Sequence, residues 1–499
     1  MQGAPRATTL STRAAQTKSR TLPGLLPAAG CAGIGALAIG SLCWRLGSSS
    51  LFIDEVASWR AADASIGELF HRVRVDEVAP PTYYLLLHVW VRILGSDREW
   101  VMRSLSVVAA VAMVGAVYWL ASMLAGRLAG SLAALLAAVS PLVLEYGQEV
   151  RAYAWAMLAV TIAAGCIVRA TREEHARSSA GSVWLALGTL AGVLALWFHY
   201  SAILVIGPLA VFACLARGVS PRLRLAHGAT IALGGLALLP ILRDQLHEGH
   251  QNAIAPIAQL TASNVERVVG APFDRTYNLL PGAVSVLAAL LVLASIAILL
   301  LPRARGVIAH PRLIACLAGL PAVALIVLTA AGRPELISRY DAVAVPFMVI
   351  AIGVGVAVWG PAGLLLTTLA LVVAVPANFA ARHRDHAYPD TRAAVAVVAR
   401  NWHGREVVLP GNGYPALPYN LQYYAQHLLP RKAFVVYSGG LSVLQAAVRD
   451  RAIGTIALIT DASRSLDELT QSFRRLHFHV DAAEPIRGSI PMQTLVVTR

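Results

Sequence analysis

The chain has few charged residues for its length. Only 14% of its 499 residues are charged, whereas soluble globular domains carry roughly 25%. Hydrophobic residues make up 57% of the chain, and the mean hydropathy is +0.63. This composition excludes an ordinary soluble domain and indicates a protein that is integral to a lipid bilayer.

Cysteine and lysine are also scarce. The five cysteines lie within or at the ends of apolar runs, and no two of them have CxxC spacing. A zinc site and a disulfide framework are therefore not indicated, and we interpret the cysteines as small buried hydrophobes. Lysine occurs only at Lys18 and Lys432, so the net charge of +14 comes from arginine.

The arginines lie in short segments between apolar runs and form no single basic face. This excludes a nucleic-acid-binding surface and is what the positive-inside rule produces. The excess of arginine and alanine is typical of a high-GC bacterial genome. We therefore expect a multi-pass protein of a bacterial plasma membrane.

The apolar runs predict eleven membrane-spanning helices. About 20 residues cross ~30 Å of hydrocarbon at 1.5 Å per residue. The predicted spans are 25–44, 101–124, 128–144, 152–168, 183–199, 201–216, 225–242, 281–301, 313–331, 340–358 and 361–380.

Arginine placement orients these spans. Residues 1–24 are basic, contain no acid and predict a disordered cytoplasmic tail. The loops on the same side contain Arg127, Arg169, Arg172, Arg177, Arg217, Arg222, Arg224, Arg303, Arg305 and Arg312. The opposite, non-cytoplasmic side then carries loops 46–100, 145–151, 243–280 and 332–339 and the segment 381–499. Within the first loop, 83–94 is too short to span and predicts an interfacial or re-entrant helix.

The segment 381–499 alternates short helical and strand-like patterns. Helices are predicted at 391–402, 417–426, 441–451 and 465–476, and strands at 406–409, 433–437, 455–460 and 494–498. This alternation predicts a small α/β domain outside the cytoplasm. Gly411-Asn412-Gly413 favours a loop turn over a nucleotide site. The predicted architecture is thus a polytopic α-helical membrane domain, 25–380, followed by an α/β domain, 381–499.

Polar clusters gather on the predicted outer side. They are Asp54-Glu55; the run from Asp76-Glu77 through Pro80-Pro81 to Tyr83, Tyr84 and His88; the run from Ser140-Pro141 through Tyr146 to Gln148, Glu149, Arg151 and Tyr153; His199-Tyr200; and Arg339-Tyr340. Acidic residues near a bilayer are expensive and indicate function when they have partners.

Each cluster also has a structural interpretation. Asp54-Glu55 could end a helix and face water, and Glu149 and Arg151 could pair within a turn. His199 could be a hydrogen-bonded interfacial residue, the tyrosines could form an aromatic belt, and Arg339 could extend to the headgroups. The functional interpretation rests on their joint occurrence on one side, because the inner loops lack this mixture of acids and aromatic residues.

The order of these motifs resembles that of the GT-C glycosyltransferases. Within that group it is most similar to the protein-mannosyltransferase-like and aminoarabinose-transferase-like bacterial enzymes. The resemblance covers roughly 25–380, and Gln148-Glu149-x-Arg151-x-Tyr153 is its most specific element. Two positions depart from the family pattern: Ala79 replaces a polar residue before the prolines, and Gly147 stands where serine is common.

The resemblance implies a glycosyltransferase that takes a hexose or pentose from a polyprenyl-phosphate donor and passes it to an extracytoplasmic hydroxyl acceptor on a protein, a lipid or a cell-wall glycan. A carboxylate base is needed to deprotonate the acceptor, and we assign this role to Asp54, with Glu55 as the alternative. Phosphate binding is assigned to Arg151, Arg339 and Tyr340. Substrate binding or support is assigned to Glu77, Tyr83, Tyr84, His88, Gln148, Glu149, Tyr153 and His199.

No cofactor is required by the spacing of these residues. A divalent cation could bind carboxylate oxygens, and Asp54 and Glu55 are the candidate ligands. Two alternative functions stay open at this point. A transporter or lipid flippase would use intramembrane charges to relay its substrate, and a receptor or assembly protein would use the outer α/β domain to bind a partner.

Overall fold

The computed structural model describes residues 25–172, 179–216, 219–247, 257–273, 282–383, 390–404, 407–411, 417–430, 434–438, 448–449, 454–461, 465–486 and 491–498. The predicted tail 1–24 lies outside these residues, as does most of the predicted helix 441–451.

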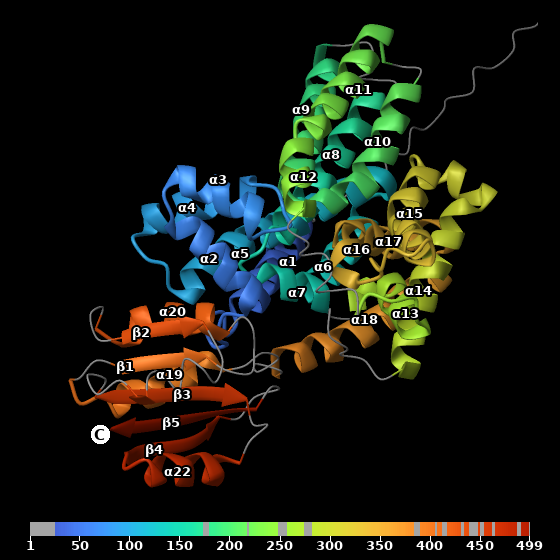
Figure 1. Cartoon of the computed structure of the whole chain (residues 1–499). Helices are drawn as coiled ribbons and strands as arrows, with labels where there is room; N and C mark the ends of the chain where they lie inside the picture. Colours follow the sequence, from blue (N-terminus) through green and yellow to red (C-terminus); the bar gives the residue numbers. More distant parts are fainter. Residues whose placement is uncertain are drawn as a thin grey trace, which may run out of the picture.

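Helices dominate the chain before residue 391 (Figure 1). They are α1 (Leu25–Cys43), α2 (Ile53–Asp63), α3 (Ile66–Val75), α4 (Thr82–Leu94), α5 (Glu99–Ala125), α6 (Arg127–Val139), α7 (Pro141–Gly147), α8 (Tyr153–Thr171), α9 (Ser179–Phe198), α10 (Ile203–Leu215), α11 (Pro221–Leu236), α12 (Leu239–His247), α13 (Ala262–Val269), α14 (Gly282–Leu300), α15 (Pro311–Ala330), α16 (Ser338–Asp341), α17 (Val345–Trp359) and α18 (Pro361–His383).

The described part of the chain contains 8 helical segments that are long and apolar enough to cross a membrane, or 9 if the bent pair α6 and α7 forms one span. The two other predicted spans, 25–44 and 201–216, coincide with the shorter apolar helices Gly30–Cys43 and Tyr200–Leu215. The protein is therefore a polytopic helical membrane protein, and a total of eleven spans stays a prediction.

The break between α6 and α7 helps to form the site. Ser140 precedes Pro141, and a residue before proline avoids the helical conformation; Ser140 is extended, with ψ of 124°. Its hydroxyl accepts a hydrogen bond from the Val143 amide at 3.4 Å and so caps the new helix. The 61° bend redirects the chain and leads it directly into the motif that ends at Tyr153.

The first outer loop, 46–100, folds into α2, α3 and α4. The predicted interfacial segment 83–94 is α4, which buries Tyr83, Tyr84 and His88 on one face and exposes Ile93 on the other. Gly95 ends this helix with a left-handed φ of 63°, a conformation that glycine adopts without strain.

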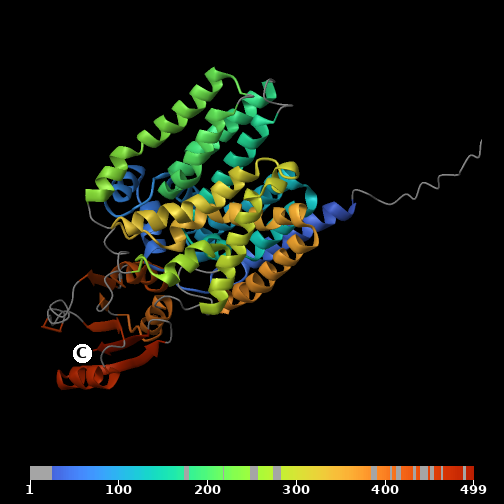
Figure 2. The ribbon, with the colours of Figure 1, turned by 90° about the vertical axis from the view of Figure 1, so that its right-hand side faces the viewer.

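A five-stranded sheet follows the membrane helices and lies at one end of the helical bundle (Figures 1 and 2). Its strands are β1 (Val407–Gly411), β2 (Phe434–Ser438), β3 (Thr455–Asp461), β4 (His479–Ile486) and β5 (Met492–Thr498), and its helices are α19 (Thr391–Arg400), α20 (Leu417–Leu428) and α22 (Leu466–Arg475). The strand order is β2-β1-β3-β5-β4; β1 is parallel to β2 and β3, whereas β5 is antiparallel to β3 and β4. The described helices and strands agree with the predicted ones except for β4, which was not predicted.

Helix α20 attaches the sheet to the first outer loop. The Leu51 amide donates to the Tyr424 hydroxyl at 2.6 Å, and Asn420 Nδ2 donates to the Leu51 carbonyl at 3.2 Å. The Tyr423 ring packs edge-on against Trp59 with centroids 5.0 Å apart. Asp97 accepts from Trp59 Nε1 at 2.9 Å. These contacts fix α20 directly over α2, the helix that carries the Asp54-Glu55 pair.

We expect this attachment to depend on pH through His427 and Asp97, whose Nε2 and Oδ1 atoms lie 2.9 Å apart. The hydrogen bond to Asp97 raises the pKa of His427. The pKa of Asp97 is lowered, because its hydrogen bonds to His427 and Trp59 outweigh its burial. The His427–Asp97 pair therefore stabilises the attachment fully below the ordinary histidine pKa of about 6.5. This stabilisation is lost as pH rises through the raised pKa of His427. At the acidic end it is lost as pH falls through the lowered pKa of Asp97.

The measurement is the difference in thermal unfolding midpoint between the wild type and His427→Gln. It should shrink as pH rises from about 6 to about 9. A difference that grows over this range would show that the charged histidine does not stabilise the attachment.

Candidate active site

A pocket with a volume of about 300 Å³ lies where the outer loops meet α20. Its walls contain Ile53, Asp54, Ala57, Arg60, Asp76, Glu77, Val78, Arg151, Tyr153, His199, Arg339, Tyr340 and Tyr419. Seven of the residues predicted for the site line it: Asp54, Glu77, Arg151, Tyr153, His199, Arg339 and Tyr340. Clusters far apart in the sequence thus converge on one cavity.

Asp54 and Arg339 face each other in this pocket. Asp54 lies in the first turn of α2, and Arg339 lies in α16, at the start of a membrane-spanning segment. Asp54 Oδ2 is 3.6 Å from Arg339 Nη1, and the two side chains are 33% and 15% exposed. The Nε of Arg339 is buried and has no hydrogen-bond partner among the described residues. The pocket therefore presents a carboxylate and a guanidinium that can both reach a bound molecule.

Glu55 points away from the pocket and is held by Arg103. Arg103 Nε donates to Glu55 Oε1 at 2.9 Å, and Arg103 Nη2 donates to Oε2 at 2.8 Å. The backbone amides of Val150 and Phe52 also donate to the same carboxylate, at 3.0 and 3.2 Å. Both side chains are almost completely buried. Since both carboxylate oxygens are occupied, the geometry favours Asp54 over Glu55 as a base.

Arg103 was not among the predicted site residues, although an arginine inside an apolar run is a signal for function or pairing. Besides Glu55, it donates to the carbonyls of Leu46, Ser49 and Ser50 at 3.0 to 3.2 Å. It therefore ties the segment before α2 to α5 and fixes the position of Asp54.

We expect the Glu55–Arg103 pair to be needed for folding. Glu55→Gln or Arg103→Met alone should lower the unfolding free energy by about 3–5 kcal/mol, because removal of one partner leaves a buried group unpaired. The double variant should lose less than the sum of the two single variants. Thermal unfolding in detergent measures this, with the exposed Arg92→Met as a control. Additive losses would show that the two residues are not coupled.

Glu77, Arg151 and Tyr84 form a second buried network beside Asp54. Arg151 Nη1 is 3.0 Å from Glu77 Oε2, and the Tyr84 hydroxyl donates to the same oxygen at 2.7 Å. Arg151 also donates to the Ser58 hydroxyl and to the Asp54 carbonyl, both at 3.3 Å. Burial raises the pKa of Glu77, and Arg151 and Tyr84 oppose this effect. Arg151 is therefore partly neutralised, and its bonds hold the first turn of α2.

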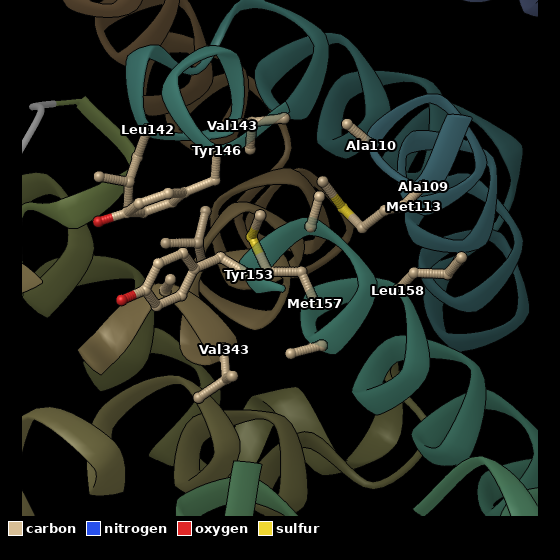
Figure 3. Close-up of a cluster of buried hydrophobic side chains, with 14 of the residues drawn as sticks. Ala109, Ala110, Met113, Leu142, Val143, Tyr146, Tyr153, Met157, Leu158 and Val343 are labelled. Carbon is tan, nitrogen blue, oxygen red and sulfur yellow. The ribbon is translucent and has the colours of Figure 1, made fainter. Parts of the chain in front are cut away.

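His199 and a group of tyrosines line the adjoining wall. The Tyr146 and Tyr153 rings lie 4.3 Å apart, and Tyr153 lies 4.7 Å from the imidazole of His199. Figure 3 shows the hydroxyl oxygens of the two tyrosines on the same side of the cluster. Burial, together with Arg151 and Arg339, lowers the pKa of His199 to about 3, so the imidazole is neutral near pH 7. Its Nδ1 accepts from the Ser201 amide at 3.2 Å, which leaves Nε2 as the donor.

The remaining wall contains residues that were not assigned to the site from the sequence. Arg60 lies over the Tyr419 ring at 4.2 Å, and Arg60 Nη1 is 3.9 Å from Asp76 Oδ2. In the sequence, the only sign that Asp76 belongs to the site is its position next to Glu77. Tyr419 belongs to α20, and no sequence signal connects it with Asp54.

Five other predicted residues are not on the pocket wall. The Tyr83 hydroxyl is 3.4 Å from Ser106, and His88 Nδ1 is 2.7 Å from the Ala62 carbonyl. Gln148 Nε2 donates to the carbonyls of Leu42 and Trp44 at 2.9 and 3.0 Å. Tyr84 contributes through Glu77, and Glu149 is buried. We interpret the contacts of Tyr83, His88 and Gln148 as support for the helices that carry the pocket.

The glycine at position 147 has a packing explanation. A Cβ atom there would lie 2.4 Å from Leu42 Cδ2 and 3.0 Å from Ala110 Cβ. α1, α5 and α7 meet closely at this point, so Gly147 permits an approach that serine would obstruct.

The structure does not support Asp54 and Glu55 as a pair of ligands for a divalent cation. The candidate ligand Glu55 is saturated by Arg103 and two backbone amides. Among the described residues there is no group of three or more His, Cys, Asp or Glu side chains that could hold an ion.

Known glycosyltransferases are similar to this chain in sequence or in fold. The family model described as dolichyl-phosphate-mannose-protein mannosyltransferase matches residues 78–242, which include Arg151, Tyr153 and His199. No curated protein matches the sequence. The apo oligosaccharyltransferase of Archaeoglobus fulgidus has a similar structure, with a TM-score of 0.50 and 10% identity over 91% of this chain and 71% of that one. ArnT of Cupriavidus metallidurans, bound to undecaprenyl phosphate, is 14% identical over 96% of this chain and 98% of that one, with a TM-score of 0.46.

The chain has the GT-C glycosyltransferase fold. The resemblance predicted from the motifs is thus confirmed, and so is the class of enzyme, a glycosyltransferase. The Pro-Pro-x-Tyr-Tyr and Gln-Glu-x-Arg-x-Tyr motifs lie within the matched residues 78–242, whereas Asp54-Glu55 precedes them.

Proposed function

We propose that this GT-C protein transfers a sugar from a polyprenyl-phosphate donor to an acceptor hydroxyl at the non-cytoplasmic face of a bacterial plasma membrane. The observation that carries the proposal is the pocket in which Asp54 faces Arg339 at 3.6 Å, at the outer ends of the membrane helices. The match to a family described by a dolichyl-phosphate sugar supports a lipid-phosphate donor. The placement of arginines at the opposite helix ends supports the orientation, with residues 1–24 inside and 381–499 outside.

The proposed reaction is a single displacement. The acceptor oxygen attacks the anomeric carbon of the donor while Asp54 takes its proton as a general base. The bond between the anomeric carbon and the phosphate oxygen breaks, and the lipid phosphate leaves with the bonding electron pair. A fixed cation near this oxygen lowers the barrier, because it stabilises the charge that develops in the transition state.

Arg339 is the residue we assign to that charge. Its Nε has no hydrogen-bond partner among the described residues, and a guanidinium can hold two phosphate oxygens at once. Tyr340 supports it, since the Arg339 guanidinium carbon lies 5.4 Å from the centroid of the Tyr340 ring. The neutral His199 can donate a further hydrogen bond through Nε2. Arg151 contributes positive potential and holds Glu77 and α2, in place of the direct phosphate contact that the sequence suggested.

An apolar groove beside this site is suited to the polyprenyl chain. It has a volume of about 580 Å³ and lies between α1, α6 and α18, with Leu37, Leu371 and Phe379 among its walls. Trp44 at its edge is hydrogen-bonded to Gln148, three residues before Arg151. A lipid tail in this groove would place its phosphate close to the outer ends of the helices.

The test uses purified protein and a panel of polyprenyl-phosphate sugars, with release of the lipid phosphate as the readout. At least one donor should release lipid phosphate in a manner that depends on enzyme concentration and is stimulated by an acceptor extract of the cell envelope. Absence of release from every donor, by protein that retains its thermal unfolding transition, would contradict the proposal.

A further inference from the structure

A third and larger cavity lies far from the candidate active site. It has a volume of about 1000 Å³ and lies between the ends of α8, α10 and α15, which puts it at the upper end of the ~300–1,000 Å³ typical of ligand pockets. Its walls are mainly apolar and include Pro208, Val211, Leu215, Leu313 and Leu320. Val211, Leu215 and Leu320 are also exposed, so the cavity is a groove that opens toward the bilayer.

The groove and the active-site pocket lie at opposite ends of the same helices. α8 begins at Tyr153 in the pocket wall and ends at Thr171 in the groove wall, which are about 27 Å apart along the helix. α10 likewise begins just after His199 and ends at Leu215 in the groove. The groove therefore belongs to the opposite membrane surface, the one predicted to be cytoplasmic.

One end of the groove is strongly basic. Arg172, Arg305 and Arg312 line it, and no carboxylate lies among the described residues of its walls. Arg172 Nη2 donates a hydrogen bond to the Met123 carbonyl. Arg305 and Arg312 are exposed. None of the three forms an ion pair with an acid in the described part of the chain. The arginines stand at the helix ends, and the apolar wall extends from them into the membrane.

The dimensions of the groove match one lipid leaflet. The wall runs along α15 from Arg312 to Leu320, about 12 Å at 1.5 Å per residue. Half of the ~30 Å hydrocarbon core is about 15 Å. An amphiphile could place its anionic headgroup at the arginines and pack its acyl chain along α10 and α15.

We propose that this groove binds an anionic phospholipid of the membrane leaflet opposite the active site. Basic pockets between helices at the cytoplasmic surface suit anionic headgroups, and the apolar wall supplies the contact area for an acyl chain. The positive-inside rule alone explains arginines anywhere in these loops. It does not explain why three of them line one end of a single leaflet-long apolar groove.

The experiment compares thermal unfolding and native mass spectra of the full chain in nanodiscs of phosphatidylcholine, with and without phosphatidylglycerol. Phosphatidylglycerol should raise the unfolding midpoint of the wild type and remain bound as an adduct. Arg305→Gln/Arg312→Gln should weaken its binding about twenty-five-fold, since each arginine near an anionic surface contributes about a factor of five.

Arg222→Gln/Arg303→Gln is the matched control, because it removes two exposed arginines from the same predicted surface but outside the groove. It should bind phosphatidylglycerol like the wild type. Val211→Trp, which fills the groove at an exposed position, should weaken binding, whereas Val183→Trp on the exposed face of α9 should not. Equal effects of the two arginine pairs, a midpoint insensitive to phosphatidylglycerol, or a response to added polyprenyl phosphate alone would overturn the proposal.

Discussion

Asp54→Asn should reduce sugar transfer by about 10²- to 10⁴-fold, the range that a positioned general base contributes. The amide keeps the size of the side chain but cannot accept the proton of the acceptor hydroxyl. The neighbouring Glu55 cannot replace it, because Glu55 is bound on both oxygens by Arg103. The loss should appear in kcat at saturating donor, and it is measured as the initial rate of lipid-phosphate release.

Asp63→Asn is the matched control for this variant. Asp63 ends the same helix, is exposed and does not line the pocket, so its amide should leave the rate unchanged. Both variants should keep the wild-type unfolding midpoint within the error of the measurement. Transfer by Asp54→Asn at near the wild-type rate would show that another group is the base.

Arg339→Ala should reduce turnover by about 10²- to 10³-fold, comparable with the loss of one preorganised donor from an oxyanion site. The guanidinium is buried beside Asp54, and the leaving phosphate would lose its direct cationic partner. Arg339→Lys keeps the charge but not the planar fork, so it should recover only part of the rate. Steady-state kinetics with the same donor separate the effect on kcat from the effect on KM.

The exposed Arg333→Ala in the same outer loop serves as the control and should behave like the wild type. Donor affinity and turnover that are both unchanged in Arg339→Ala would remove this residue from the mechanism. An equal loss in Arg333→Ala would instead indicate a general electrostatic effect of the outer surface.

The convergence of the site could be predicted from the sequence because it follows from topology. Once apolar runs and arginines determine which loops share a side, Asp54, Arg151, His199 and Arg339 must lie on one surface. The 3.6 Å approach of Asp54 to Arg339 depends on helix packing and could not be predicted. Tyr419 was missed for the same reason, since α20 reaches the pocket through contacts formed more than 300 residues away in the chain.

The different roles of Asp54 and Glu55 also could not be predicted from the sequence. Successive helical residues point about 100° apart, so one of two adjacent acids must leave the pocket. Glu55 is the residue that leaves the pocket, because Arg103 and the Val150 amide bind its carboxylate. Both groups come from distant segments of the chain. β4 was missed because it is polar and contains Pro485, which an edge strand tolerates and an interior strand does not.

The anomeric configuration of the product tests the proposed mechanism most directly. An anomerically pure polyprenyl-phosphate sugar is incubated with the enzyme and its acceptor, and the configuration of the new glycosidic bond is read by NMR. If Asp54 is the base of a single displacement, the product has the inverted configuration, with one lipid phosphate released per bond formed. A retained configuration would mean that a covalent intermediate forms, as it would if Asp54 were the nucleophile, and would contradict the mechanism.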